Sequence, residues 1–248
     1  MPREEAKIET RDGSCHAFVF TPEGRGPWPA VIVYMDAFGM RPAMLEMAGR
    51  LSAGGYLVLL PDLFHRLEDQ EPKVPAEVAG NPALRDKLMT KIASLDREKR
   101  ISDGGAYIEF LSSRRDVTGN RFGITGYCMG GNAALTVAGA YPGRFAAIAS
   151  FHGGNLASER PESPHRFLKG ISGRVYVAGA DEDASFPEEQ KEGLEKALTD
   201  AGIDHFIETY PGARHGFAVP DSPSFDQDAS ERHWKALFDL LGKAQWNR

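Results

Sequence analysis

Short apolar runs alternate with longer amphipathic stretches along this chain. The short runs predict buried strands at residues 30–35, 56–60, 122–125, 146–151, 175–178 and 205–209, and the alternating residues 15–21 predict an early edge strand. The longer stretches carry apolar residues at three- and four-residue spacing and predict helices at residues 42–53, 93–113, 132–140, 187–201 and 230–242. Such alternation is typical of an α/β fold: a mostly parallel sheet with helices on both faces.

One segment departs from this alternation. Residues 65–90 are rich in proline and charge, and Pro72, Pro75 and Pro82 interrupt any helix there. We expect an excursion over the carboxyl edge of the sheet, either a lid or a surface loop. Because the chain contains no internal repeat and no linker-like stretch, we expect a single domain over residues 1–248.

Composition narrows the class of protein. The chain has 29 basic and 35 acidic residues and a net charge of −6, so it lacks the positive field that gathers nucleic acid. It contains neither an apolar run of membrane-spanning length nor a signal-peptide profile, which predicts a cytoplasmic protein without a membrane partner. Its two cysteines, Cys15 and Cys128, are too few for a disulfide framework or a zinc ribbon, so any cysteine chemistry would involve a single thiol.

The strongest local motif is Gly-Tyr-Cys-Met-Gly-Gly at residues 126–131. It lies between a predicted strand and a predicted helix, which is the setting of a nucleophile elbow. A nucleophile in that sharp turn has a strained backbone, and Gly126 and Gly130 avoid clashes beside it. The helix N-terminus favours a thiolate at Cys128 and lets the N–H of Met129 point at a developing oxyanion.

A thiol nucleophile needs a base and a group that orients the base. In this architecture they follow the nucleophile in the order acid, then histidine. Asp181 and Asp183 lie in the turn after the strand at 175–178, and chain position alone does not choose between them. His215 leaves the last strand in a loop and is our candidate base. We find no ligand spacing typical of a metal site and expect neither a metal nor an organic cofactor.

Most of the chain resembles the dienelactone hydrolases, a branch of the α/β-hydrolase fold whose nucleophile is cysteine. The resemblance rests on residues 126–131, on Pro-Asp-Leu-Phe at 61–64, on His-Gly-Phe at 215–217 and on the acidic turn before Pro187. It implies a single-domain α/β-hydrolase fold and, from the distance to that proline, selects Asp183 as the triad acid. It also implies that the backbone N–H of Ala37 completes the oxyanion hole with Met129.

The resemblance also implies functions for the surrounding residues. A carboxylate in the family contacts the resting thiol, and Asp36, where the family has Glu, takes that thiol-gating or pocket position. The family grips a substrate carboxylate with arginines, one of them four residues after the histidine, where this chain has Val219. Arg85 or Arg214 could supply a cation instead. The remaining candidates for substrate contact are Phe38, Tyr127 and His152.

We therefore expect a hydrolase that cleaves a small-molecule ester or lactone by acyl transfer through Cys128, Asp183 and His215, acting as a monomer or homodimer. A thiol redox protein that uses Cys128 is the first alternative, although no second cysteine lies nearby in the sequence. The second alternative is a binding protein that retains the fold without turnover.

Overall fold

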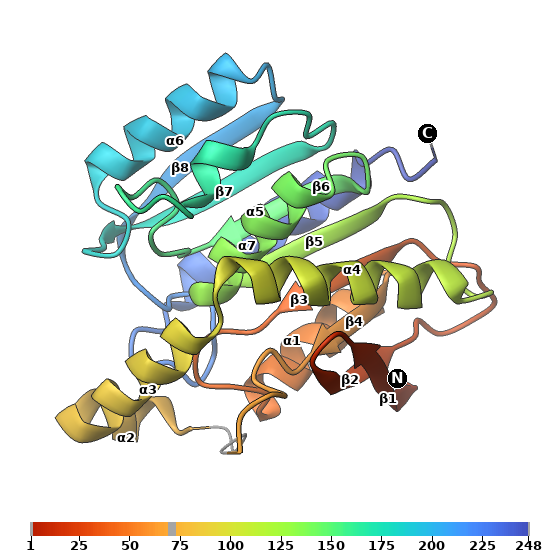
Figure 1. Cartoon of the computed structure of the whole chain (residues 1–248), viewed down its shortest axis with the longest axis horizontal. Helices are drawn as coiled ribbons and strands as arrows, with labels where there is room; N and C mark the ends of the chain where they lie inside the picture. The colour runs from red at the N-terminus through yellow and green to blue at the C-terminus, as the bar shows by residue number, and fades with distance from the viewer. Residues whose placement is uncertain (1, 69–72, 248) are drawn as a thin grey trace.

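One mixed sheet organises the chain in the computed structural model, which describes residues 2–68 and 73–247 (Figure 1). Within these residues, eight strands lie in the order β1-β2-β4-β3-β5-β6-β7-β8. Their bounds are β1 Arg3–Thr10, β2 Gly13–Phe20, β3 Ala30–Tyr34, β4 Leu57–Pro61, β5 Phe122–Tyr127, β6 Phe145–Phe151, β7 Arg174–Glu182 and β8 His205–Arg214. Strands β4, β3, β5, β6, β7 and β8 are parallel, while β1 and β2 are antiparallel to their neighbours.

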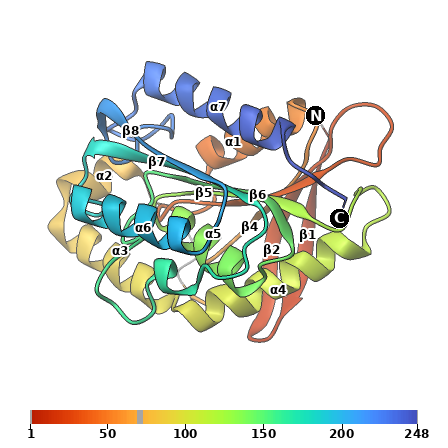
Figure 2. The ribbon, with the colours of Figure 1, turned by 90° about the horizontal axis from the view of Figure 1, so that it is seen from above.

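Helices cover both faces of the sheet (Figure 2). Helices α1 and α7 lie on one face, and α4, α5 and α6 lie on the other. The helices described are α1 Pro42–Ala53, α2 Pro75–Gly80, α3 Pro82–Ser94, α4 Arg97–Ser113, α5 Met129–Ala140, α6 Glu188–Asp200 and α7 Gln227–Gly242, with a 3₁₀ turn at Pro164–Phe167. This arrangement confirms the predicted α/β fold.

The sheet interior explains why its central strands were recognisable. All residues of β3, β4, β5 and β6 are buried, as expected for strands covered by helices on both faces. In contrast, β1 has one buried residue, Ile8, and its charged sequence gave no strand signal. The strand predicted at residues 15–21 is confirmed as β2, but its predicted position at the edge was wrong, because β1 pairs with β2 along its whole length and is itself the edge.

The segment at 65–90 is more helical than its prolines indicated. Pro75 and Pro82 are the first residues of α2 and α3, where a missing N–H costs no helical hydrogen bond. Pro72 lies outside the described residues. The helix expected at 93–113 is two helices, because α3 ends at Ser94 and the Asp96 carboxylate caps α4 by accepting from the N–H of Lys99 at 2.9 Å.

Candidate active site

Cys128 lies in a sharp turn between β5 and α5. Its φ of 56° is in the left-handed region, which costs a non-glycine residue energy. A Cβ on Gly126 would lie 2.1 Å from the carbonyl oxygen of Gly130, and a Cβ on Gly130 would lie 2.4 Å from the carbonyl oxygens of Tyr34 and Met35. The two glycines therefore allow a backbone approach that no other residue permits, and this approach brings the start of α5 against the end of β3.

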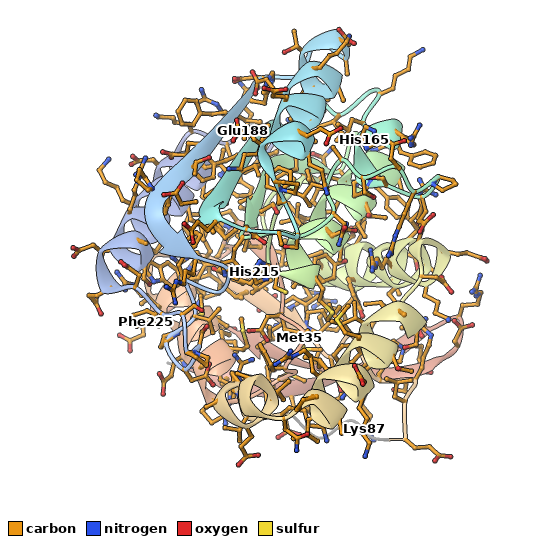
Figure 3. All side chains as sticks on the ribbon, turned by 90° about the vertical axis from the view of Figure 1, so that its left-hand side faces the viewer. Met35, Lys87, His165, Glu188, His215 and Phe225 are labelled. Carbon is orange, nitrogen blue, oxygen red and sulfur yellow. The ribbon has the colours of Figure 1, made fainter. Side chains whose placement is uncertain are left out.

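His215 links the Cys128 sulfur to an acid. It follows β8 directly, hydrogen-bonds Cys128, and its Nδ1 lies 2.7 Å from Oδ2 of Asp183. Burial alone would lower the pKa of His215, but the negative charge of Cys128 and the hydrogen bond to Asp183 outweigh burial and raise that pKa to about 11. Figure 3 looks onto this edge of the sheet, with His215 near the middle of the view.

The structure brings Asp183, and not Asp181, to the histidine. The Asp181 carboxylate instead accepts the backbone N–H of Gly212 at 2.9 Å. Burial favours the neutral form of Asp183, yet the hydrogen bond to His215 outweighs burial and lowers the pKa of this carboxyl. The charged carboxylate can therefore hold the imidazole in one orientation.

Ser185 is a site residue that the sequence analysis missed. Its hydroxyl donates to Oδ1 of Asp183 at 2.6 Å and lies 3.2 Å from Nδ1 of His215. Its backbone N–H also donates to Oδ1 of Asp183, at 2.9 Å. An Asp followed two residues later by Ser in a turn is a known local pairing, so the signal was present in the sequence.

The two backbone groups expected to form an oxyanion hole lie on adjoining segments. Met129 is the first residue of α5, so its N–H has no acceptor within the helix. Ala37 is buried in the loop after β3, beside the close approach at Gly130. Among the described residues, neither N–H donates to a protein acceptor. Both therefore remain able to bind a negatively charged oxygen.

Asp36 is buried and bound to an arginine. Both of its carboxylate oxygens accept from Arg41, at 2.6 and 2.9 Å, and Oδ1 also accepts the N–H of Phe38 at 3.0 Å. The same guanidinium donates to Asp221, at 2.7 and 2.8 Å. Burial raises the pKa of Asp36 despite the opposing effect of Arg41. The sequence alone did not predict this cluster, because Arg41 and Asp221 are 180 positions apart.

The other predicted contact residues are dispersed. The His152 ring lies 5.2 Å from that of His215, and neither ring nitrogen has a hydrogen-bond partner among the described residues. The buried hydroxyl of Tyr127 pairs with His233, 3.0 Å away, on the α7 side of the sheet.

Phe38 is half-buried in the loop that carries Ala37, and its carbonyl accepts the N–H of Lys73 at 2.8 Å. The Arg85 guanidinium is exposed on α3 and donates to Ala79.

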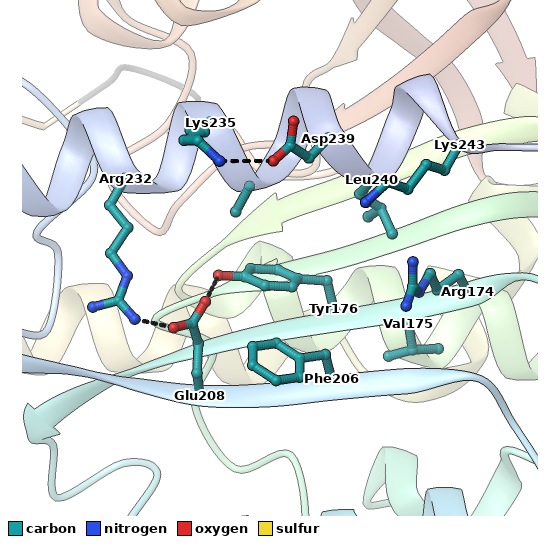
Figure 4. A pocket seen from close by; sticks show the side chains of 11 residues that line it. Arg174, Val175, Tyr176, Phe206, Glu208, Arg232, Lys235, Asp239, Leu240 and Lys243 are labelled. Carbon is teal, nitrogen blue, oxygen red and sulfur yellow. Dashed lines mark hydrogen bonds and ion pairs between the residues drawn. The ribbon is translucent and has the colours of Figure 1, made fainter.

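A separate hollow of about 480 Å³ lies between β7, β8 and α7 (Figure 4). Its floor includes Tyr176 and Phe206, and Arg232 pairs with Glu208 at its rim. None of the triad residues lines it. Across the described ranges, no group of three His, Cys, Asp or Glu could hold a metal ion, and no helix is long and apolar enough to cross a membrane.

Similar proteins point to one family. Two curated relatives that bear the name "Putative carboxymethylenebutenolidase" are each 28% identical to this chain. The Synechocystis relative matches over 90% of this chain and 89% of its own length, and the Yersinia pestis relative over 95% and 86%.

Solved structures and a family model agree. A structure named m3DLH has a TM-score of 0.81 and 25% identity, with 98% of both chains covered. A dienelactone hydrolase-like promiscuous phosphotriesterase from metagenomic libraries has a TM-score of 0.76 and 24% identity over 98% of this chain and 99% of its own, a likeness of fold. The model of the dienelactone hydrolase family matches residues 15–245, and the chain belongs to that family.

Proposed function

We propose that this protein hydrolyses a small-molecule ester or lactone through a covalent thioester on Cys128. The observation that carries the proposal is the position of His215, whose ring contacts the thiol on one side and the Asp183 carboxylate on the other. A nucleophile, a base and a group that orients the base are the parts that acyl transfer requires. The nucleophile, Cys128, lies in a strained turn, and a structural cysteine would gain nothing from its positive φ.

The first half of the reaction forms the thioester. His215 takes the proton of the Cys128 thiol, and the resulting thiolate attacks the carbonyl carbon. The N–H groups of Ala37 and Met129 stabilise the oxyanion of the tetrahedral intermediate. The C–O bond to the leaving group then breaks, and His215 donates its proton to the departing oxygen.

The second half restores the enzyme. The now neutral His215 takes a proton from a water molecule, and the hydroxide attacks the thioester carbonyl. The C–S bond breaks, a carboxylic acid leaves, and the sulfur takes a proton back from His215. Asp183 stabilises the charged ring in both halves of the cycle.

The relatives' name and one buried side chain support a class of substrate. The relatives' name refers to a lactone hydrolase, which supports a lactone or ester. Val219 is fully buried where the resemblance implies an arginine, so that position offers no cation to a substrate carboxylate. We therefore favour an uncharged ester or lactone over the carboxylate-bearing dienelactone.

The position of the second cysteine argues against the redox alternative. Cys15 is fully buried in β2, where its sulfur lies 3.4 Å from the hydroxyl of Tyr107. Burial raises the pKa of this thiol to about 12, which suppresses the thiolate needed to resolve a sulfenic acid.

Hydrolysis of a small aryl acetate tests the proposal. Cys128→Ala and His215→Ala should each abolish turnover, while Cys15→Ala and His16→Ala, which remove a thiol and an imidazole away from the triad, should retain it. Full turnover in Cys128→Ala would refute the nucleophile. Binding of the ester without turnover in the wild type would favour the binding protein, and a disulfide between the cysteines after peroxide treatment would favour the redox protein.

A further inference from the structure

We propose that Arg41 is a positioning residue that holds the Asp36 carboxylate away from Cys128, so that His215 is the partner of the resting sulfur. The inference rests on the proposed nucleophile and adds how that nucleophile is kept available. It concerns a residue that touches neither the triad nor, in the proposed reaction, the reacting atoms.

The hydrogen bonds of Asp36 are its first support. Two guanidinium N–H groups and one backbone N–H occupy both carboxylate oxygens, all within 3.0 Å. Both Asp36 and Arg41 are buried, with side chains about 5% exposed. A charge-assisted bidentate pair in such surroundings has a fixed geometry, because releasing either partner leaves a buried charge uncompensated.

The position of the Asp36 loop is the second support. The carbonyl oxygens of Tyr34 and Met35, just before Asp36, pack against Gly130 at the start of α5. A carboxylate that left Arg41 would therefore lie close to the Cys128 turn. Arg41 lies five residues further along the same loop and binds that carboxylate.

Asp221 fixes the arginine in turn. Its carboxylate takes two N–H groups of Arg41 and comes from the loop that follows His215. The guanidinium thus joins the loop of the Ala37 amide to the loop of the base. A lysine could not donate to both carboxylates in this planar, two-sided manner.

The charged and titratable groups of the Cys128–His215 pair and of the Asp36–Arg41 cluster come from four segments. They are Asp36 and Arg41 after β3, His152 after β6, Asp183 at the end of β7, and Asp221 after β8. Burial lowers the pKa of His152 far below its ordinary value, so this ring is neutral. Asp36 is a negative group on the loop beside the Cys128 turn, and Arg41 supplies two of the three N–H groups that hold its carboxylate.

This arrangement bears on substrate choice. The Asp36 carboxylate is bound by an arginine of the same chain, so its position does not depend on a charge carried by the substrate. The nucleophile is then ready before any substrate binds, and uncharged esters react without an activating carboxylate.

Alkylation of Cys128 by iodoacetamide tests the inference without requiring turnover. In a Cys15→Ala background, with the label located by mass spectrometry, we expect Arg41→Met to lower the alkylation rate at pH 6 at least about tenfold, because a nearby carboxylate disfavours the thiolate. The double variant Arg41→Met, Asp36→Asn should recover the rate to within about threefold. If Arg41 acted only by its own charge, the double variant would stay as slow as the single one.

A matched control removes an equivalent ion pair elsewhere. Arg66 binds both oxygens of buried Asp103, at 2.6 and 2.5 Å, so Arg66→Met tests whether general loss of stability slows alkylation. If Arg41→Met fails to fold, Arg41→Lys, alone and with Asp36→Asn, should show the same fall and recovery. An unchanged rate in the single variant, no recovery in the double variant, or an equal fall in Arg66→Met would each overturn the inference. Turnover in Cys128→Ala would instead refute the proposed function alone.

Discussion

Gly130→Ala is expected to damage both stability and activity, although alanine is the better helix former. Gly130 lies in the first turn of α5, where alanine would ordinarily stabilise the helix by about 1 kcal/mol. Here the new methyl would lie 2.4 Å from two backbone carbonyl oxygens, and Cβ atoms essentially never approach closer than 3.0 Å. The start of α5 must therefore move from β3 by about 0.6 Å, the difference between these distances.

The magnitudes follow from that displacement. Forcing a methyl into a packed contact costs about 1–3 kcal/mol, which in a chain of this size lowers Tm by roughly 2–12 °C. The displacement also separates the N–H of Met129 from that of Ala37. Loss of one oxyanion donor reduces kcat by about 10²–10³, so partial misplacement should cost about 10- to 100-fold.

Thermal unfolding and aryl acetate hydrolysis measure the two effects. Gly143→Ala is the matched control, because a Cβ at Gly143 meets nothing within 4 Å. Its Tm and kcat should stay near those of the wild type. A Gly130→Ala protein as stable and as active as the wild type would refute the argument that this glycine is required for the approach of α5 to β3.

Three further results are expected. Asp183→Asn should lower kcat by about 10³–10⁴ in the aryl acetate assay, whereas Asp181→Asn should stay within about threefold of the wild type, and equal losses would contradict the assignment of the acid. His152→Phe should raise the free energy of unfolding, measured in urea, by about 1 kcal/mol, because phenylalanine removes two buried, unpartnered nitrogens; a loss of stability would show that they have partners. Iodoacetamide should alkylate Cys128 more slowly in His215→Ala than in the wild type at neutral pH, because the variant lacks the base that takes the thiol proton, and equal rates would contradict the pairing of the thiol with His215.

The pKa shifts of His215 and Asp183 make the stability of the fold depend on pH. In the folded state the pKa of His215 is raised to about 11. The stabilisation that its charged form contributes is therefore complete below pH 6.5 and is lost as the pH rises from 6.5 to about 11. Asp183 has the opposite dependence, because its pKa is lowered: its contribution is present above pH 3.8 and is lost as pH falls below it. Urea unfolding at a series of pH values measures both contributions. If the free energy of unfolding of His215→Gln changed with pH just as that of the wild type does, the contribution assigned to His215 would be contradicted.

Local patterns were sufficient for the parts of the molecule that depend on neighbouring residues. The elbow at Cys128 could be predicted because its strand, turn and helix are contiguous, and the central strands because both of their faces are apolar. Chain order placed His215 at the correct edge of the sheet. The choice of Asp183 needed the resemblance, because a pattern of residues does not show which of two nearby carboxylates points at a ring.

Features set by exposure or by distant partners could not be predicted. Strand β1 carries charged residues on an exposed edge, so no apolar alternation marks it. The break between α3 and α4 depends on the Asp96 cap within an otherwise continuous helical pattern. Arg41 meets Asp221 only because the loops after β3 and β8 converge in three dimensions.

The elbow has a consequence for how this protein can evolve. Its shape is set by backbone approach at Gly126 and Gly130, and the Cys128 side chain makes no capping hydrogen bond to α5. Exchange of sulfur for oxygen therefore alters the reactivity of the site without redesign of the scaffold. A lineage can pass between thiol and alcohol chemistry by one substitution, while any replacement of either glycine must first rebuild the contact between helix and strand.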